Sequence, residues 1–226
     1  MGVDARRTAT LLAKDARLQA SAFEVLVLFE LGTFLTFVAQ FPPPMRATAG
    51  VLLQGTAAIG TFVMAYRSVA VEDSGGTIRF LKSLPLSTSD IYGSKFAFMA
   101  LYVLANAAAL NVLFAVCRAV LPWDMAPVTV QAVVVGLVVQ LGFAAVLVAV
   151  ATLSSSEKAV WVPFPVVVVL LNLYTVTSSR EHTAGSSVLQ TLSDAWAAYS
   201  LLGLLLVLAL VLVVVRLLGR KTSLVG

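Results

Sequence analysis

The residues of this sequence with the clearest chemical potential are one carboxylic acid and several carboxamides inside long apolar stretches. Glu30 is the acid, and the amides are Gln54, Asn106, Asn111, Gln140 and Asn172. A carboxylate inside a bilayer costs several kcal/mol unless it is neutral, paired or facing water. Nearly one amide falls in each stretch, which predicts a shared polar interior. Two interpretations stay open: interhelical hydrogen bonds, each worth about 0.6–2 kcal/mol, or a pathway or gate for a cargo, with Glu30 first to test.

Residue types that catalyse reactions or hold metals are scarce. The residues that could serve as axial ligands to a metal are His182, Cys117 and five methionines. His182 is typical of a solvated loop histidine, and Cys117 of a small apolar residue near a helix end. No HExxH motif and no Ser/His or paired-Asp arrangement is present for intramembrane hydrolysis. We therefore expect no catalytic residue, no metal site and no cofactor bound by this chain itself.

A polar segment, Glu72–Lys95, interrupts the apolar sequence. Gly75-Gly76 ends the preceding helix cheaply, and the next eight residues can form two helical turns before Pro85 stops them. Ser87–Asp90 resembles a capping box that starts another helix. We interpret the segment as a short amphipathic helix that docks on a soluble partner; the alternative is a solvated loop. The residues expected to contact the partner are Glu72, Asp73, Gly75, Gly76, Ile78, Arg79, Leu81, Lys82, Leu84 and Pro85.

The composition places these residues in a membrane protein. Of 226 residues, 60% are hydrophobic and 12% are charged, about half the charged fraction of a soluble domain. Stretches of roughly 20 apolar residues can span a bilayer. The sequence predicts an all-α membrane domain over residues 22–217, followed by a tail, 218–226. Its six expected spans are Ala22–Phe41, Ala47–Ala70, Phe96–Leu121, Val128–Leu153, Ala159–Val176 and Trp196–Leu217.

The segment before the first span, residues 1–21, predicts an amphipathic helix. At 100° per residue one face carries Ala5, Ala9, Leu12, Ala16 and Ala20, with Arg6, Arg7, Lys14 and Arg17 beside it. Such a helix lies in the membrane interface and is attracted to anionic lipid. The alternative is a cytoplasmic cap on the first span.

Basic residues predict the orientation of the chain. If the N-terminus is cytoplasmic, that side carries twelve of the fifteen lysines and arginines, and the far side carries Arg46, Arg118 and Arg180. The positive-inside rule then places both termini in the cytoplasm and Glu72–Lys95 on the same side. We expect a multi-pass protein of the plasma (inner) membrane. The longest outer connection is the Ser- and Thr-rich segment 177–195, whose role stays open.

Two motifs resemble a known family. The run Arg67…Glu72-Asp73-x-Gly75-Gly76-x-Ile78-x-x-Leu81-x-x-Leu84-Pro85-Leu86-Ser87, followed by Ser94-Lys95, resembles the cytoplasmic loop of type-2 ABC exporter permeases. The likeness is greatest to the haem-exporter protein B family of cytochrome c maturation. Trp161-Val-Pro163-Phe-Pro165 resembles the proline-containing start of that family's fifth span.

The resemblance implies a type-2 ABC exporter fold in which Glu72–Lys95 is the coupling helix, seated in a separate ATPase subunit. It also implies a second permease copy or a related permease, and a hydrophobic or amphipathic cargo, with haem as the first expectation. Independently, the sequence has no GxxxxGK[ST] phosphate loop, so ATP would be bound by the partner. We expect no nucleic-acid partner.

Two alternatives remain at this stage. One is a permease of the same class that exports a drug, peptide, lipid or polysaccharide. The other is a non-transporting scaffold that recruits a partner to an assembly complex through the same loop.

Overall fold

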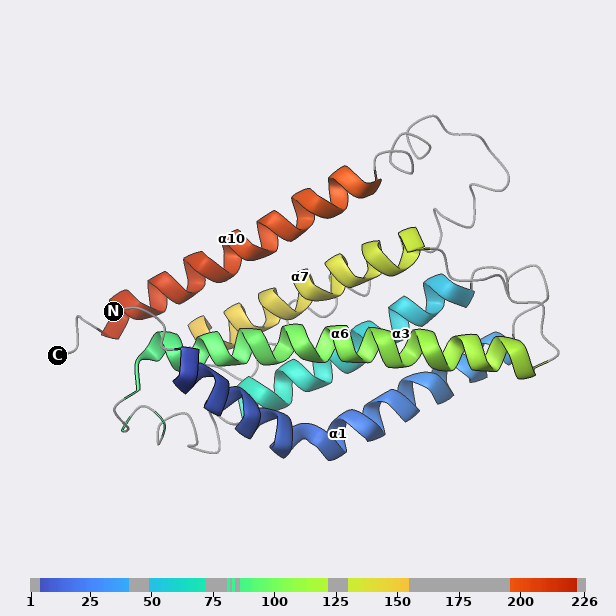
Figure 1. Cartoon of the computed structure of the whole chain (residues 1–226), viewed down its shortest axis with the longest axis horizontal. Helices are drawn as coiled ribbons and strands as arrows, with labels where there is room; N and C mark the ends of the chain where they lie inside the picture. Colours follow the sequence, from blue (N-terminus) through green and yellow to red (C-terminus); the bar gives the residue numbers. More distant parts are fainter. Residues whose placement is uncertain are drawn as a thin grey trace.

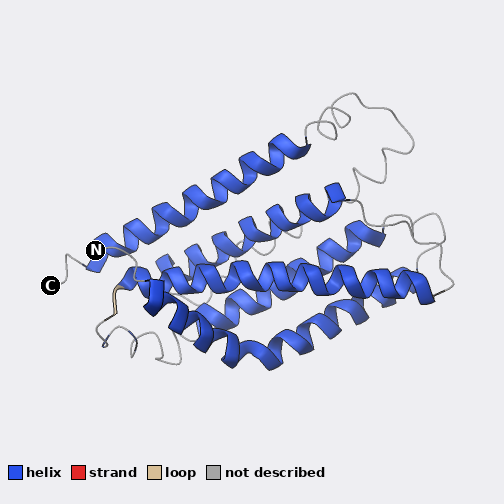
Figure 2. Ribbon diagram, in the orientation of Figure 1, coloured by secondary structure: helices blue, strands red, loops and turns tan. Residues whose placement is uncertain are grey.

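Every element of regular secondary structure that the structure describes is a helix. The computed structural model describes residues 5–40, 49–71, 81, 83, 86–121, 130–154 and 196–222. Its helices are α1 (Ala5–Gln40), α3 (Ala49–Ala65), the π-helix η1 (Tyr66–Val71), α6 (Thr88–Val120), α7 (Val130–Ser154) and α10 (Trp196–Thr222) (Figures 1 and 2). The predicted all-α class is therefore confirmed for these residues.

Four of these helices are long and apolar enough to cross a membrane, within the part of the chain that is described. The qualifying stretches are Arg6–Thr36, Asp90–Val120, Val133–Leu153 and Ala197–Leu217. The second predicted span corresponds to α3 and its continuation η1. The fifth, Ala159–Val176, and the outer segment 177–195 lie outside the described residues. Six spans therefore stay a prediction.

The ends of the helices show how the chain runs through the bundle. The start of α1, the start of α6 and the end of α10 lie at one end, which we call the loop end (Figure 1). The prediction that both termini lie on one side of the membrane requires the start of α1 and the end of α10 to lie at the same end of the bundle. Helix α7 ends at the loop end, whereas α10 begins at the opposite one (Figure 1), as a crossing between them requires.

Helix α1 differs from the sequence-based expectation of two separate elements. It is one helix of 36 residues, about 54 Å long at 1.5 Å per residue, and it bends partway along (Figure 1). No break separates the predicted interfacial helix from the first span. The buried side chains of its first half are Leu11, Asp15 and Gln19, while Ala9, Ala16 and Ala20 are exposed. Leu12, on the same predicted apolar face, is partly buried and packs against the main core, so among the described side chains of this face only the alanines are exposed.

Helix α6 lies at the centre of the packing and contacts α1, α3, α7 and α10. It begins two turns before the predicted third span because the capping box forms: Asp90 N donates to Ser87 Oγ at 3.1 Å, and Ser87 N donates to Asp90 Oδ2 at 3.3 Å. Its apolar contacts with α3 and α7 form the main core, around Met99, Val103 and Leu147.

Candidate functional site

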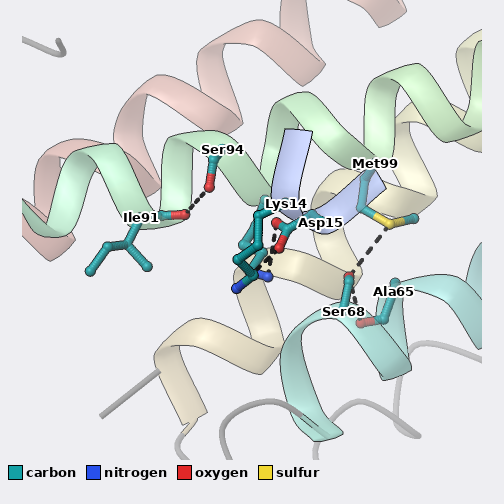
Figure 3. A network of polar contacts seen from close by, with 8 residues as sticks. Lys14, Asp15, Ala65, Ser68, Ile91, Ser94 and Met99 are labelled. Carbon is teal, nitrogen blue, oxygen red and sulfur yellow. Dashed lines mark hydrogen bonds and ion pairs between the residues drawn. The ribbon is translucent and has the colours of Figure 1, made fainter. Parts of the chain in front are cut away.

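A buried ion pair joins α1 to the start of α6. Lys95 Nζ lies 2.9 Å from Asp15 Oδ2, and the two side chains are 1% and 2% exposed. Lys14 Nζ lies 3.4 Å from the other carboxylate oxygen, Oδ1; Figure 3 shows Lys14 and Asp15 side by side. Removing one partner of such a pair leaves an uncompensated buried charge, which is strongly destabilising. The pair therefore fixes α1 to α6.

A second polar contact joins α1 to η1. Arg67 Nε donates to Gln19 Oε1 at 3.2 Å, and Gln19 follows Asp15 by four residues, on the same face of the helix. We call Asp15, Gln19, Arg67 and Lys95 the anchor cluster. Arg67 precedes the predicted coupling segment, and Lys95 ends it. Both flanks of that segment are thus bound to α1.

Contacts between η1 and α6 complete this end of the bundle. Ser68 Oγ donates to Ala65 O at 3.3 Å and lies 3.7 Å from Met99 Sδ. Figure 3 shows this link near Asp15 of the anchor cluster. Single π-helical turns are frequent at functional sites, and here the turn carries the side chain that binds Gln19.

Between Glu72 and Pro85, the part of the segment before the capping box, the structure describes only Leu81 and Ser83. Leu81 is buried and packs with Leu11 of α1 and Ile91 of α6. Its side chain thus faces its own chain, which leaves little surface for the partner expected at this position. The other nine residues predicted to dock on a partner lie outside the described residues, so their role stays a prediction.

A second polar cluster lies deeper in the bundle, on the same helix α1. Glu30 Oε2 accepts a hydrogen bond from Asn106 Nδ2 at 2.9 Å, and both residues are buried. Gly60 of α3 faces them: a Cβ there would collide with Glu30 Oε1 and lie 2.6 Å from Tyr102 Oη. We call Glu30, Gly60, Tyr102 and Asn106 the acid cluster. It joins α1, α3 and α6 through polar groups in an apolar interior.

Comparison with known proteins decides the family. The sequence pattern of the ABC-2 family transporter proteins matches residues 10–218, nearly the whole chain. The chain belongs to the ABC-2 transporter family. It is therefore a membrane permease subunit of an ABC transporter, a class whose ATPase is a partner subunit. No curated protein matches the chain.

In this ABC-2 permease the structure shows contacts of some predicted interior residues, whereas their role as a pathway or gate stays a prediction. Glu30 and Asn106 meet, as the sequence suggested. Asn111 does not join them, because its Nδ2 donates to Ala107 O of its own helix at 2.7 Å. Gln140 is buried on α7. The side chain of Gln54 and all of Asn172 lie outside the described residues.

Sequence reasoning missed four members of the two clusters. Tyr102 precedes Asn106 by one helical turn, so this spacing was a usable signal. Gly60 carried none, because a glycine in an apolar helix has no side chain to mark its neighbours. Asp15 and Gln19 were missed because the segment before the first predicted span was assumed to be a separate interfacial helix.

The anchor cluster makes a prediction about stability. We expect Asp15→Asn to destabilise the permease by about 3–5 kcal/mol, because Lys95 stays buried without its partner. The control is Glu24→Gln, an exposed carboxylate on the same helix, with an effect of about 0.5 kcal/mol or less. Chemical denaturation in detergent micelles measures both. Equal losses of stability in the two variants would show that the buried pair contributes no more to stability than an exposed carboxylate.

The acid cluster makes a prediction about Gly60. We expect Gly60→Ala to cost about 1–3 kcal/mol, because the added methyl group displaces the Glu30 carboxyl. Gly32→Ala on α1 is the matched control: its Cβ would meet nothing within 4 Å, and it should be neutral or stabilising by up to about 1 kcal/mol. The same denaturation assay applies. A Gly60→Ala protein as stable as wild type would rule out this packing.

Proposed function

We propose that an ABC ATPase docks on the segment Glu72–Lys95 and that α1 transmits the resulting movement into the membrane. The anchor cluster is the observation that carries this proposal. A force on the segment reaches the bundle at its two flanks, and Arg67 and Lys95 bind α1 there. Leu81 adds an apolar contact to the same part of α1.

The continuity of α1 supplies the path to the acid cluster. Glu30 follows Asp15 by fifteen residues of uninterrupted helix, about 22 Å at 1.5 Å per residue. A tilt of α1 relative to α6, with the Asp15–Lys95 pair as its pivot, would change the contact between Glu30 and Asn106. Coupling of this kind needs an element with two arrangements that both sites bias. We propose α1 as that element and Glu30 as the gate that it moves.

The distribution of basic residues supports a cytoplasmic loop end. Among the described residues this end carries nine lysines and arginines: Arg6, Arg7, Lys14, Arg17, Arg67, Lys95, Arg216, Arg220 and Lys221. The opposite end carries Arg118. The positive-inside rule then puts the loop end in the cytoplasm, where an ATPase would bind.

The cargo we propose is hydrophobic or amphipathic, because the described helices that can span a membrane carry few charged side chains in their apolar stretches. The likeness of the loop and of Trp161–Pro165 to haem-exporter protein B favours haem in cytochrome c maturation. Driven release of haem from a carrier fits as well as passage through the bundle. We further propose that the permease functions as a dimer with a second copy or a related permease.

Docking is tested by isolating the tagged permease from its native membranes. We expect an ABC ATPase to co-purify, and Leu84→Asp to lower its recovery about tenfold, since loss of one interface anchor costs 1.4 kcal/mol or more. Thr222→Asp, at the loop end but outside the segment, is the control and should retain the ATPase. Absence of an ATPase from the wild-type sample, or its full retention by Leu84→Asp, would contradict docking at this segment.

A further inference from the structure

A groove of about 300 Å³ opens between α1 and α6. On α1 its lining includes Leu12, Ala16, Ala20 and Phe23, which share one face of the helix. On α6 it includes Leu101 and Ala105. Ala20, Leu101 and Ala105 are exposed at the surface of the bundle. Both helices are long and apolar enough to span a membrane, so the groove opens toward lipid.

A basic side chain stands at the flank of this groove. Arg17 directly follows Ala16 and lies 60° around the helix from Ala20 at 100° per residue. It is exposed, and no hydrogen bond or ion pair joins it to another described residue. Lys14, by contrast, contacts Asp15. Arg17 is thus placed to bind an anion at the interface.

The acidic residue at the groove fixes the direction of a bound molecule. Glu24 also lines the groove, about 10 Å further along α1 than Arg17 at 1.5 Å per residue. An anionic group is therefore attracted to the Arg17 end and repelled from the Glu24 end. The Arg17 end is the one nearer the start of α1, at the loop end of the bundle, where a headgroup would lie.

We propose that the groove holds one acyl chain of an anionic phospholipid whose phosphate pairs with Arg17. An acyl chain gains no hydrophobic free energy when it moves from the bilayer into the groove, because the lipid tails around it are already apolar. Packing against the groove holds the chain, and the charge of Arg17 selects the headgroup. A basic side chain near an anionic membrane surface contributes about 1 kcal/mol.

The bound chain would also touch the acid cluster indirectly. Phe23 and Tyr102 line the groove and meet edge to face, with ring centroids 5.8 Å apart. The hydroxyl of Tyr102 lies against Gly60 beside Glu30. A lipid in the groove therefore supports the ring that borders the proposed gate. The lipid site itself does not depend on ATPase docking.

Native mass spectrometry of the whole purified chain tests this site, with phosphatidylglycerol and phosphatidylcholine of identical acyl chains as probes. We expect the wild type to retain phosphatidylglycerol preferentially and Arg17→Gln to lower that retention about fivefold. Arg17→Lys should restore it. Ala105→Trp fills the groove and should displace both lipids, whereas Ala108→Trp, exposed on α6 outside the groove, should not.

Three results would overturn the proposal. The first is a wild-type protein that retains the two lipids equally or retains neither lipid. Retention of neither lipid would be expected if a protein segment covered the groove. The second is an Arg17→Gln protein that binds like the wild type. The third is equal behaviour of Ala105→Trp and Ala108→Trp. Thermal melting by circular dichroism confirms folding, and Ala20→Leu replaces Ala105→Trp if that variant does not fold.

Discussion

The buried ion pair between Asp15 and Lys95 is the constraint on which the arrangement of this permease depends. Its two charges are almost fully removed from water, so neither helix can move away without exposing a charge or leaving one unpaired. Buried pairs contribute little net stability compared with apolar side chains, but they penalise every arrangement that separates them. The pair thereby specifies how α1, α6 and the polar segment between η1 and α6 fit together.

Helix α1 connects this buried ion pair to polar groups deeper in the bundle. One face of it carries Asp15 and Gln19 near the loop end, and further along it carries Glu30. Each of these polar groups meets a partner on another helix: Lys95, Arg67 and Asn106. Between the two clusters, Phe23 packs on Tyr102. The membrane permease subunit of an ABC transporter needs such a connection between the site of its ATPase and the interior of the bilayer.

Local signals in the sequence predicted the helices well and their pairing poorly. The capping box at Ser87 and the start of α10 at Trp196 were both readable, because they depend on neighbouring residues. The meeting of Glu30 with Asn106 was expected from the cost of polar groups in a bilayer. The pair of Asp15 with Lys95 was not, since the partners are eighty residues apart and their contact depends on how α1 is rotated and bent. Gly60 matters only because its lack of a side chain leaves room for the Glu30 carboxyl group.

The most direct test of transmission through α1 replaces the buried pair by uncharged side chains. The double variant Asp15→Asn/Lys95→Met leaves no unpaired buried charge, so it should fold with near wild-type stability and retain the ATPase. If the pair transmits movement, ATP turnover per recovered complex should change by about fivefold or more, the usual range of coupling between sites. A double variant that is stable, binds the ATPase and turns over ATP at the wild-type rate would contradict the account. The pair would then have a structural role only.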